Sequence, residues 1–274
     1  MRVRLAGFSI VLVLCTANSA HAVAPRYYLA LGDSLAVGVQ PTVRGDVPTN
    51  QGYADDLYAL YHTRIPNLRL AKLGCSGETT KTMIVGGVCR YPLGSQLLQA
   101  VSFLQRHDVA FVTIDIGGDN VYRCFSLAGI NGTCVIEGTA AAIIDLPQII
   151  SVLRAVAPTV PIYAMNYYDP FLAAWTIGPA GQVLAAQSLD LTLAFNNVLA
   201  SIYAGFGIPV ADVAAAYHIT DLTPFFGTGI PLNVLVSLTW TWMGLPPPLG
   251  PDIHPNAVGY GAIAAAFVNV IGAP

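Results

Sequence analysis

The sequence contains few charged residues. Only 10% of its 274 residues are Asp, Glu, Lys or Arg, and the formal net charge is −3 at pH 7. The absence of a basic cluster argues against a nucleic-acid partner. The chain also lacks internal repeats and any linker rich in glycine, serine or charge. We therefore expect one domain, which follows an N-terminal segment that does not belong to the fold.

The N-terminal apolar run, Leu5–Cys15, is too short to cross a bilayer. It follows two arginines and precedes Ala20-His21-Ala22, which has the small-x-small pattern of a cleavage site. These features predict a signal peptide over 1–22, cleaved near Ala22, and a secreted domain over 23–274. An uncleaved N-terminal anchor is the alternative.

The cysteines include no CxxC pair, and no histidine lies near them in the sequence, so we expect no metal site. Loss of the signal peptide leaves Cys75, Cys89, Cys124 and Cys134. An even set in an oxidising compartment predicts two disulfides, for which three connectivities exist. We favour the sequence-local pairs Cys75–Cys89 and Cys124–Cys134. Four buried free thiols are the alternative.

Short apolar runs alternate with longer helical patterns, although 54% of all residues are hydrophobic. This alternation predicts a three-layer α/β/α fold with a central parallel sheet. The segments 27–32, 68–73, 109–116, 162–166 and 209–213 are the predicted strands. The predicted helices are 53–62, 94–105, 139–155, 181–203 and 257–270. We interpret the uncharged, proline-rich segment 222–250 as a long apolar loop beside a binding site.

Polar, glycine-bearing turns follow the first three predicted strands. They contain Ser34, Gly77 and the sequence Gly-Gly-Asp-Asn at 117–120, and His254 lies in a loop before the last predicted helix. In open α/β sheets, ligands bind beyond the carboxyl ends of the strands. Nucleophilic acyl transfer needs a serine, a base that accepts its proton, and donors for the developing oxyanion. Ser34 and His254 are candidates for the first two roles.

Four segments in order resemble the sequence blocks of the SGNH (GDSL-type) hydrolase superfamily. They are LALGDSLAVG, KLGCSGETT, DIGGDNV and DIHPNAVGY. The resemblance implies a flavodoxin-like sheet and ester hydrolysis through an acyl-enzyme, without metal or cofactor. It makes Ser34 the nucleophile, His254 the base, and Gly77 an oxyanion donor through its backbone N–H. The position of Ser34 in its turn makes the Ser34 backbone N–H a second candidate donor. Asp33 would hold the turn instead of reacting.

The third block departs from the family pattern, which is Gly-x-Asn-Asp. Here Asp119 stands where the oxyanion-binding amide is expected, and an ionised carboxylate would repel an oxyanion. Because glycines are conformationally permissive, we expect the pair at 117–118 to let the turn present Asn120 instead. Asn166 is a reserve amide, although a structural role suits it better.

The fourth block also departs, since Pro251 stands where the family has an aspartate three residues before the histidine. Pro255 biases His254 toward an extended conformation, in which residues two apart project to the same side. We therefore predict that Asp252 orients the imidazole, with a backbone carbonyl as the alternative. His218 is the rival candidate for the base.

These features predict a secreted serine esterase or lipase. The alternative is a catalytically impaired binding protein of the same fold, which would bind lipid or glycan esters. The uncharged segments 170–189 and 222–250 are candidates to line an apolar pocket, which favours a hydrophobic ester as substrate. We allow transient contact with a lipid surface and expect a monomer.

Overall fold

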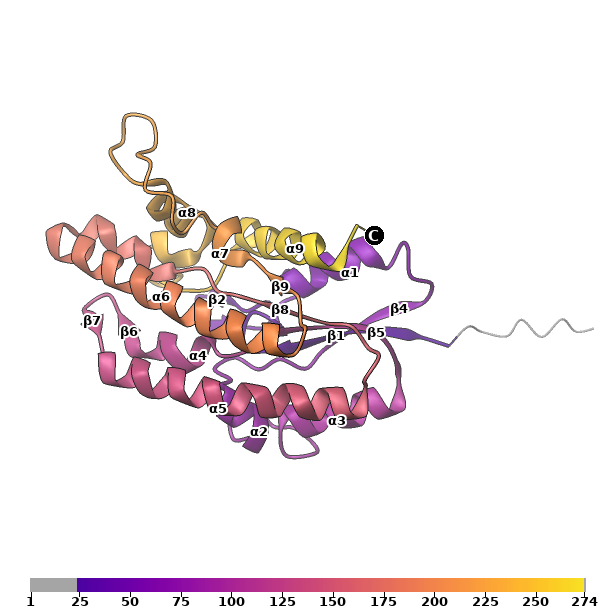
Figure 1. Ribbon diagram of the computed structural model, residues 1–274. Helices are drawn as coiled ribbons and strands as arrows, with labels where there is room; N and C mark the ends of the chain where they lie inside the picture. The colour runs from indigo at the N-terminus through magenta and orange to yellow at the C-terminus, as the bar shows by residue number, and fades with distance from the viewer. Residues whose placement is uncertain (1–23, 274) are drawn as a thin grey trace, which may run out of the picture.

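The computed structural model describes residues 24–273, so the predicted signal peptide and its cleavage site lie outside the described residues. Five parallel strands form the central sheet in the order β4-β1-β5-β8-β9 (Figure 1). The strands are β1 (Arg26–Gly32), β4 (Leu68–Lys72), β5 (Asp108–Asp115), β8 (Ile162–Met165) and β9 (Val210–Ala211). All five lie where the sequence predicts strands. The central strands β1 and β5 are buried on both faces, which is why they are nearly continuous apolar runs.

Helices cover both faces of this sheet, as the three-layer prediction requires. Figure 1 shows α1 and α9 over one face and α2, α3 and α5 over the other, with α6 beside α5. Their bounds are α1 Tyr53–Tyr61, α2 Thr80–Val85, α3 Gln96–Arg106, α5 Gly132–Val156, α6 Pro179–Gly205 and α9 Ala257–Ile271. Helix α5 begins seven residues before its predicted start, because the Asn131 side chain caps it by accepting a hydrogen bond from the Cys134 N–H.

Segment 222–250, predicted as a loop, contains two helical elements. Helix α8 spans Leu232–Trp240, and the 3₁₀ helix η3 spans Trp242–Gly244. No proline interrupts the nine residues of α8, and Pro231 stands at its N-cap, where a missing N–H costs nothing. The buried side of α8 packs against the 3₁₀ helix η2 (Pro170–Ile177). The prolines of this segment therefore delimit a helix instead of preventing one.

Two disulfides close short loops. Cys75, in the turn after β4, is bonded to Cys89, and Cys124 is bonded to Cys134 at the start of α5. Both bonds follow the sequence-local pairing. A loop such as that between Cys75 and Cys89 stabilises a fold by about 3 kcal/mol on the chain-entropy model. The first bond thereby fixes the turn that carries Gly77.

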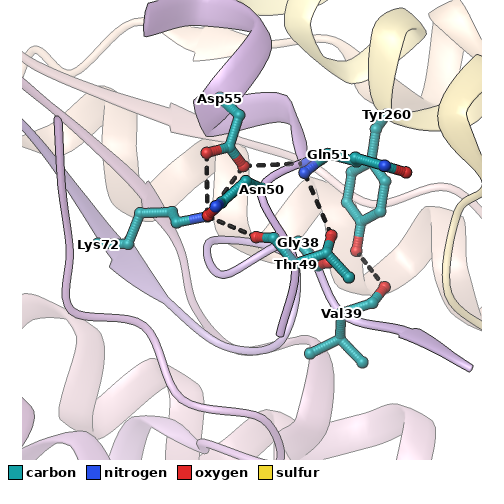
Figure 2. A network of polar contacts seen from close by, with 9 residues as sticks. Gly38, Val39, Thr49, Asn50, Gln51, Asp55, Lys72 and Tyr260 are labelled. Atoms are coloured by element: carbon teal, nitrogen blue, oxygen red, sulfur yellow. Dashed lines mark hydrogen bonds and ion pairs between the residues drawn. The ribbon is translucent and has the colours of Figure 1, made fainter. Parts of the chain in front are cut away.

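An ion pair fixes the segment that follows the Ser34 turn (Figure 2). Lys72 Nζ, at the end of β4, lies 2.9 Å from Asp55 Oδ2 and donates to the Thr49 carbonyl at 2.7 Å. Both charged side chains are only 17% exposed, so the pair is better shielded than a surface salt bridge. Tyr260 of α9 donates to the Val39 carbonyl at 2.8 Å, which ties the same segment to the last helix.

A buried carboxyl group starts η2, beside the cavity described below. Asp169 Oδ1 accepts a hydrogen bond from the Phe171 N–H at 2.9 Å, and Oδ2 accepts one from Ser188 Oγ at 2.7 Å. Burial raises the pKa of Asp169 to about 7, although these hydrogen bonds oppose the shift. Burial likewise raises the pKa of Asp115, at the end of β5, to about 7.

We expect the protein to be more stable at pH 5 than at pH 8. The pKa values of Asp115 and Asp169 are raised in the folded state, so between pH 4 and 7 the folded protein binds more protons than the unfolded chain. Its free energy of unfolding must therefore fall as the pH rises through that window. Thermal unfolding at several pH values measures this decrease, and Asp169→Asn is expected to make it smaller. A melting temperature that rises from pH 5 to pH 8 would contradict the raised pKa values of Asp115 and Asp169 in the folded protein.

Candidate active site

The turn that carries Ser34 begins at Gly32, the last residue of β1. Gly32 has a φ of +138°, and a Cβ there would lie 2.3 Å from the Asp115 carbonyl oxygen, so only glycine fits. Asp33 Oδ1 accepts a hydrogen bond from the Leu35 N–H at 3.0 Å, which agrees with its expected role in holding the turn. Ser34 follows at the carboxyl edge of the sheet and is only 7% exposed.

Asp115 braces this turn from the neighbouring strand β5. Its Oδ2 accepts hydrogen bonds from the Asp33 N–H at 3.3 Å and the Ala36 N–H at 3.1 Å, and its Oδ1 accepts one from Tyr53. The Gln96 side chain of α3 accepts a hydrogen bond from the Gly32 N–H at 2.7 Å and donates one to the Gly32 carbonyl at 2.8 Å. Sequence reasoning missed both side chains. The signal for Asp115 was a single acidic residue at the end of a buried apolar strand.

The histidine of the fourth block is held by Asp252. His254 Nδ1 lies 2.8 Å from Asp252 Oδ1, and the same oxygen accepts a hydrogen bond from the His254 N–H at 2.8 Å. Burial acts to raise the pKa of Asp252, but its hydrogen bonds and the charge of His254 outweigh burial and hold this pKa below its ordinary value. Asp252, two residues before His254 in the chain, is thus suited to accept a hydrogen bond from the imidazole Nδ1–H.

Trp240, the last residue of α8, and Trp242, the first residue of η3, hold the loop that carries His254. The Trp242 N–H donates to the His254 carbonyl at 3.1 Å, and the Asp252 N–H donates to the Trp242 carbonyl at 3.3 Å. The Asn256 N–H donates to the Trp240 carbonyl at 2.9 Å. The backbone of the two tryptophans therefore positions the histidine loop. The sequence did not reveal this role, because it depends on the placement of α8 and η3.

A second carboxyl group approaches the imidazole. Asp46 lies on β3 (Gly45–Val47), which forms a hairpin with β2 (Gln40–Thr42), and its Oδ2 is 3.9 Å from His254 Nδ1. Burial and the charge of Asp252 raise the pKa of Asp46, and His254 opposes that shift. Within residues 24–273, Asp46, Asp252 and His254 are the one group whose donor atoms are close enough to hold a metal ion. Because Asp252 already engages Nδ1, the arrangement fits an oriented imidazole better than a metal centre.

Ser34 and His254 line the same small cavity, of about 20 Å³. Its walls also include Asp119, Tyr122, Tyr167, Tyr168, Pro170 and Ile253. Within residues 24–273, the hydrogen bond of the His254 side chain is to Asp252, and none joins it to the side chain of Ser34. Such catalytic hydrogen bonds are often long before substrate binds. The exposed His218, by contrast, does not line this cavity.

The third block does not present Asn120 to the cavity. Both hydrogens of its amide are engaged, by Thr80 Oγ1 at 2.8 Å and the Gly138 carbonyl at 3.1 Å, and Oδ1 accepts a hydrogen bond from the Thr80 N–H at 2.9 Å. The expectation that Asn120 supplies the oxyanion amide is thereby corrected, and Asp119 lines the cavity. Asn166, the reserve amide, donates to Asp212 Oδ1 at 2.8 Å, away from the cavity.

A wider groove adjoins the Ser34–His254 cavity. The groove has a volume of about 310 Å³ and shares Asp119, Tyr122 and Ile253 with that cavity. It extends along apolar side chains that include Phe171 and Met243. Segments 170–189 and 222–250 thus both contribute to the groove, as expected. They also enclose a separate pocket around Leu172, Trp175, Leu222 and Val234, which does not include Ser34.

The site combines a serine with a histidine that an aspartate orients, at the carboxyl edge of a doubly wound sheet. This arrangement is typical of serine hydrolases. The sequence model of the GDSL-like lipase/acylhydrolase family matches residues 30–262. The chain belongs to this family and is a carboxylic ester hydrolase. No curated protein matches the chain in sequence.

Solved structures share the fold. The extracellular lipase of Streptomyces rimosus has a TM-score of 0.60 and 18% identity, over 90% of this chain and 100% of that one. Phospholipase A1 from Streptomyces albidoflavus has a TM-score of 0.54 and 20% identity, over 91% and 100% of the two chains. A putative GDSL-like lipase from Parabacteroides merdae has a TM-score of 0.57 and 12% identity, over 92% and 97%. At these identities the likeness concerns the fold alone.

Proposed function

We propose that this protein cleaves esters through an acyl-enzyme formed on Ser34, with His254 as the general base and Asp252 as the group that orients it. The hydrogen bond between Asp252 and His254, beside a cavity that Ser34 also lines, carries the proposal. Because Asp252 engages Nδ1, the other ring nitrogen is left to accept the Ser34 proton.

In the first half-reaction, Ser34 Oγ attacks the ester carbonyl while His254 Nε2 accepts its proton. The imidazolium then gives this proton to the departing alcohol, which leaves an ester on Ser34. In the second half, a water molecule gives a proton to His254 and attacks that ester, and the acid leaves as the proton returns to Ser34. The backbone N–H groups of Ser34 and Gly77 are the proposed donors to the oxyanion.

The experiment is hydrolysis of chromogenic esters of graded acyl length, with Ser34→Ala as the blank. The apolar groove beside the cavity supports a hydrophobic acyl chain or alcohol as the group bound there. We expect hydrolysis that depends on Ser34 and increases from acetyl to longer chains. A folded protein that hydrolyses none of these esters would favour the alternative, a binding protein of the same fold.

Export from the cell completes the proposal. The sequence pattern of residues 1–22 and the two disulfides both support a secreted protein, since disulfides persist in oxidising compartments.

We further propose that residues 222–231, the apolar finger, contact the surface of a lipid aggregate. The finger projects away from the layers between α7 (Val213–Ala216) and α8 (Figure 1). It contains no charged residue, and the exposed fraction of its Phe226 is 92%. The Phe225 N–H donates to the Ile230 carbonyl at 2.9 Å, and the Thr228 N–H donates to the Phe225 carbonyl at 3.0 Å. These internal bonds reduce the cost of placing the backbone in an apolar medium.

Phe226→Ser is expected to weaken binding to zwitterionic phospholipid vesicles about tenfold or more, since burial of such a side chain contributes about 1.5–3 kcal/mol. Vesicle co-sedimentation measures the binding. The matched control is Ile144→Ser, because Ile144 is 71% exposed but lies on α5. Hydrolysis of a soluble short-chain ester should be unchanged in both variants. Equal vesicle binding by wild type and Phe226→Ser would contradict the proposed contact.

A further inference from the structure

Asp119 occupies a fixed position at the Ser34–His254 cavity. The preceding Gly117 has a φ of +116°, and a Cβ on Gly118 would come within 2.6 Å of the Tyr167 ring. The two glycines therefore fit the turn tightly in its present form instead of loosening it. Since Asn120 is held on the other side of the turn by Thr80, the side chain that reaches the cavity from this block is a carboxyl group.

The hydrogen bonds of this carboxyl group are incomplete. The Gly77 backbone N–H donates to the Asp119 side chain, whereas Asp119 Oδ2 is buried and has no hydrogen-bond partner within residues 24–273. A buried, unpaired carboxylate oxygen is costly when it is charged. The same oxygen carrying a proton would be a hydrogen-bond donor, and a substrate oxyanion in the cavity would be a suitable acceptor.

We propose that Asp119 acts as a neutral carboxylic acid and donates a hydrogen bond to the oxyanion, in place of the amide of the family pattern. This inference rests on the proposed esterase function. An ionised Asp119 would repel the oxyanion and would also compete with it for the Gly77 N–H. The neutral acid removes the repulsion, is a weaker acceptor for that N–H, and supplies a further donor. Carboxylic acids kept neutral in apolar sites serve as donors of this kind.

Burial favours this protonation state of Asp119, and the charges nearby act in both directions. Burial raises the pKa of Asp119 to about 6, whereas the charges of His254 and Arg123 lower it and that of Glu78 raises it. Asp33 also interacts with Asp119, and the charge of Asp119 raises the Asp33 pKa. The active form of Asp119 is the protonated one, so its contribution is present below about pH 6 and is lost as the pH rises. His254 must be neutral to act as a base, and activity must therefore fall at low pH as well.

The test compares kcat/KM for a soluble chromogenic ester from pH 4.5 to 9 in wild type, Asp119→Asn and Asp119→Ala. Wild type should lose activity as the pH rises above about 6, and Asp119→Asn should not. At pH 8 only about 1% of a group with a pKa of about 6 is protonated, so Asp119→Asn should exceed wild type there by up to about 100-fold. Asp119→Ala should stay about 10²- to 10³-fold below Asp119→Asn at every pH, because it lacks the donor.

The variant Arg123→Gln distinguishes a chemical role of Asp119 from a merely structural one, because only a chemical role would make the pH dependence of activity change in this variant. Loss of this exposed cation should raise the Asp119 pKa and shift the descending limb of the wild-type profile to higher pH. Thermal unfolding verifies that each variant is folded. Asp119→Asn that is no faster than wild type at pH 8, or that keeps the descending limb, would overturn the inference while leaving the esterase function intact. Failure of every folded variant to hydrolyse esters would overturn the proposed function, and this inference with it.

Discussion

Ser34→Ala will lower kcat for ester hydrolysis by about 10⁴- to 10⁶-fold, which is the range seen when a serine hydrolase loses its nucleophile. The variant keeps the turn intact, because the hydrogen bonds that hold it involve Asp33, Asp115 and backbone groups instead of the Ser34 hydroxyl. Its melting temperature should therefore stay close to that of wild type. Steady-state kinetics and thermal unfolding of the same preparations check both statements.

The double variant Ser34→Ala/His254→Ala is the control for this first prediction. Residues that act as one catalytic unit are strongly non-additive, so the double variant should be no slower than Ser34→Ala alone. A further large loss in the double variant would mean that His254 contributes independently of the serine. Substantial hydrolysis by Ser34→Ala would mean that another residue is the nucleophile, which would contradict the proposal.

Asp252→Ala will lower kcat by about 10²- to 10⁴-fold, which is the second-largest effect we expect. Asp252 fixes the tautomer and orientation of His254 through a 2.8 Å contact and stabilises the imidazolium that forms during the reaction. Steady-state kinetics of wild type and Asp252→Ala measure this loss.

Asp46→Asn is the matched control for Asp252→Ala. Asp46 also lies near the imidazole, but at 3.9 Å, and its side chain is 43% exposed. We expect its replacement to cost less than tenfold. Equal losses in the two variants would assign the orienting role to both carboxyl groups. Loss of wild-type activity in EDTA, with recovery on adding a divalent metal, would instead assign the cluster to metal binding.

Much of the fold could be predicted because its signals are local. The five strands are short apolar runs, and their parallel arrangement follows from the helical patterns between them. The placement of Asp252 beside His254 was also predictable, since it depends on only three residues and on the conformational bias of Pro255. These features need no knowledge of distant contacts.

The features that could not be predicted depend on contacts between distant segments. The sequence suggests a mobile glycine pair before Asp119, whereas the Tyr167 ring, from after another strand, holds that turn in place. In the sequence, Asp115 is simply the last residue of an apolar strand. Its role in bracing the turn becomes visible only when the Ser34 turn lies beside it in the fold. Helix α8 was hidden by the prolines around it, although its last residue and the following Trp242 of η3 carry the backbone groups that hold the histidine loop.

Covalent labelling with an active-site-directed phosphonate ester, followed by peptide mass spectrometry, tests the central claim most directly. The tryptic peptide 27–44 contains Ser34 as its one serine, so the modified position is readily assigned. The proposal predicts one phosphonyl group per protein on that peptide, and its loss in both Ser34→Ala and His254→Ala. A label on another peptide, or an unlabelled protein that still hydrolyses esters, would contradict it.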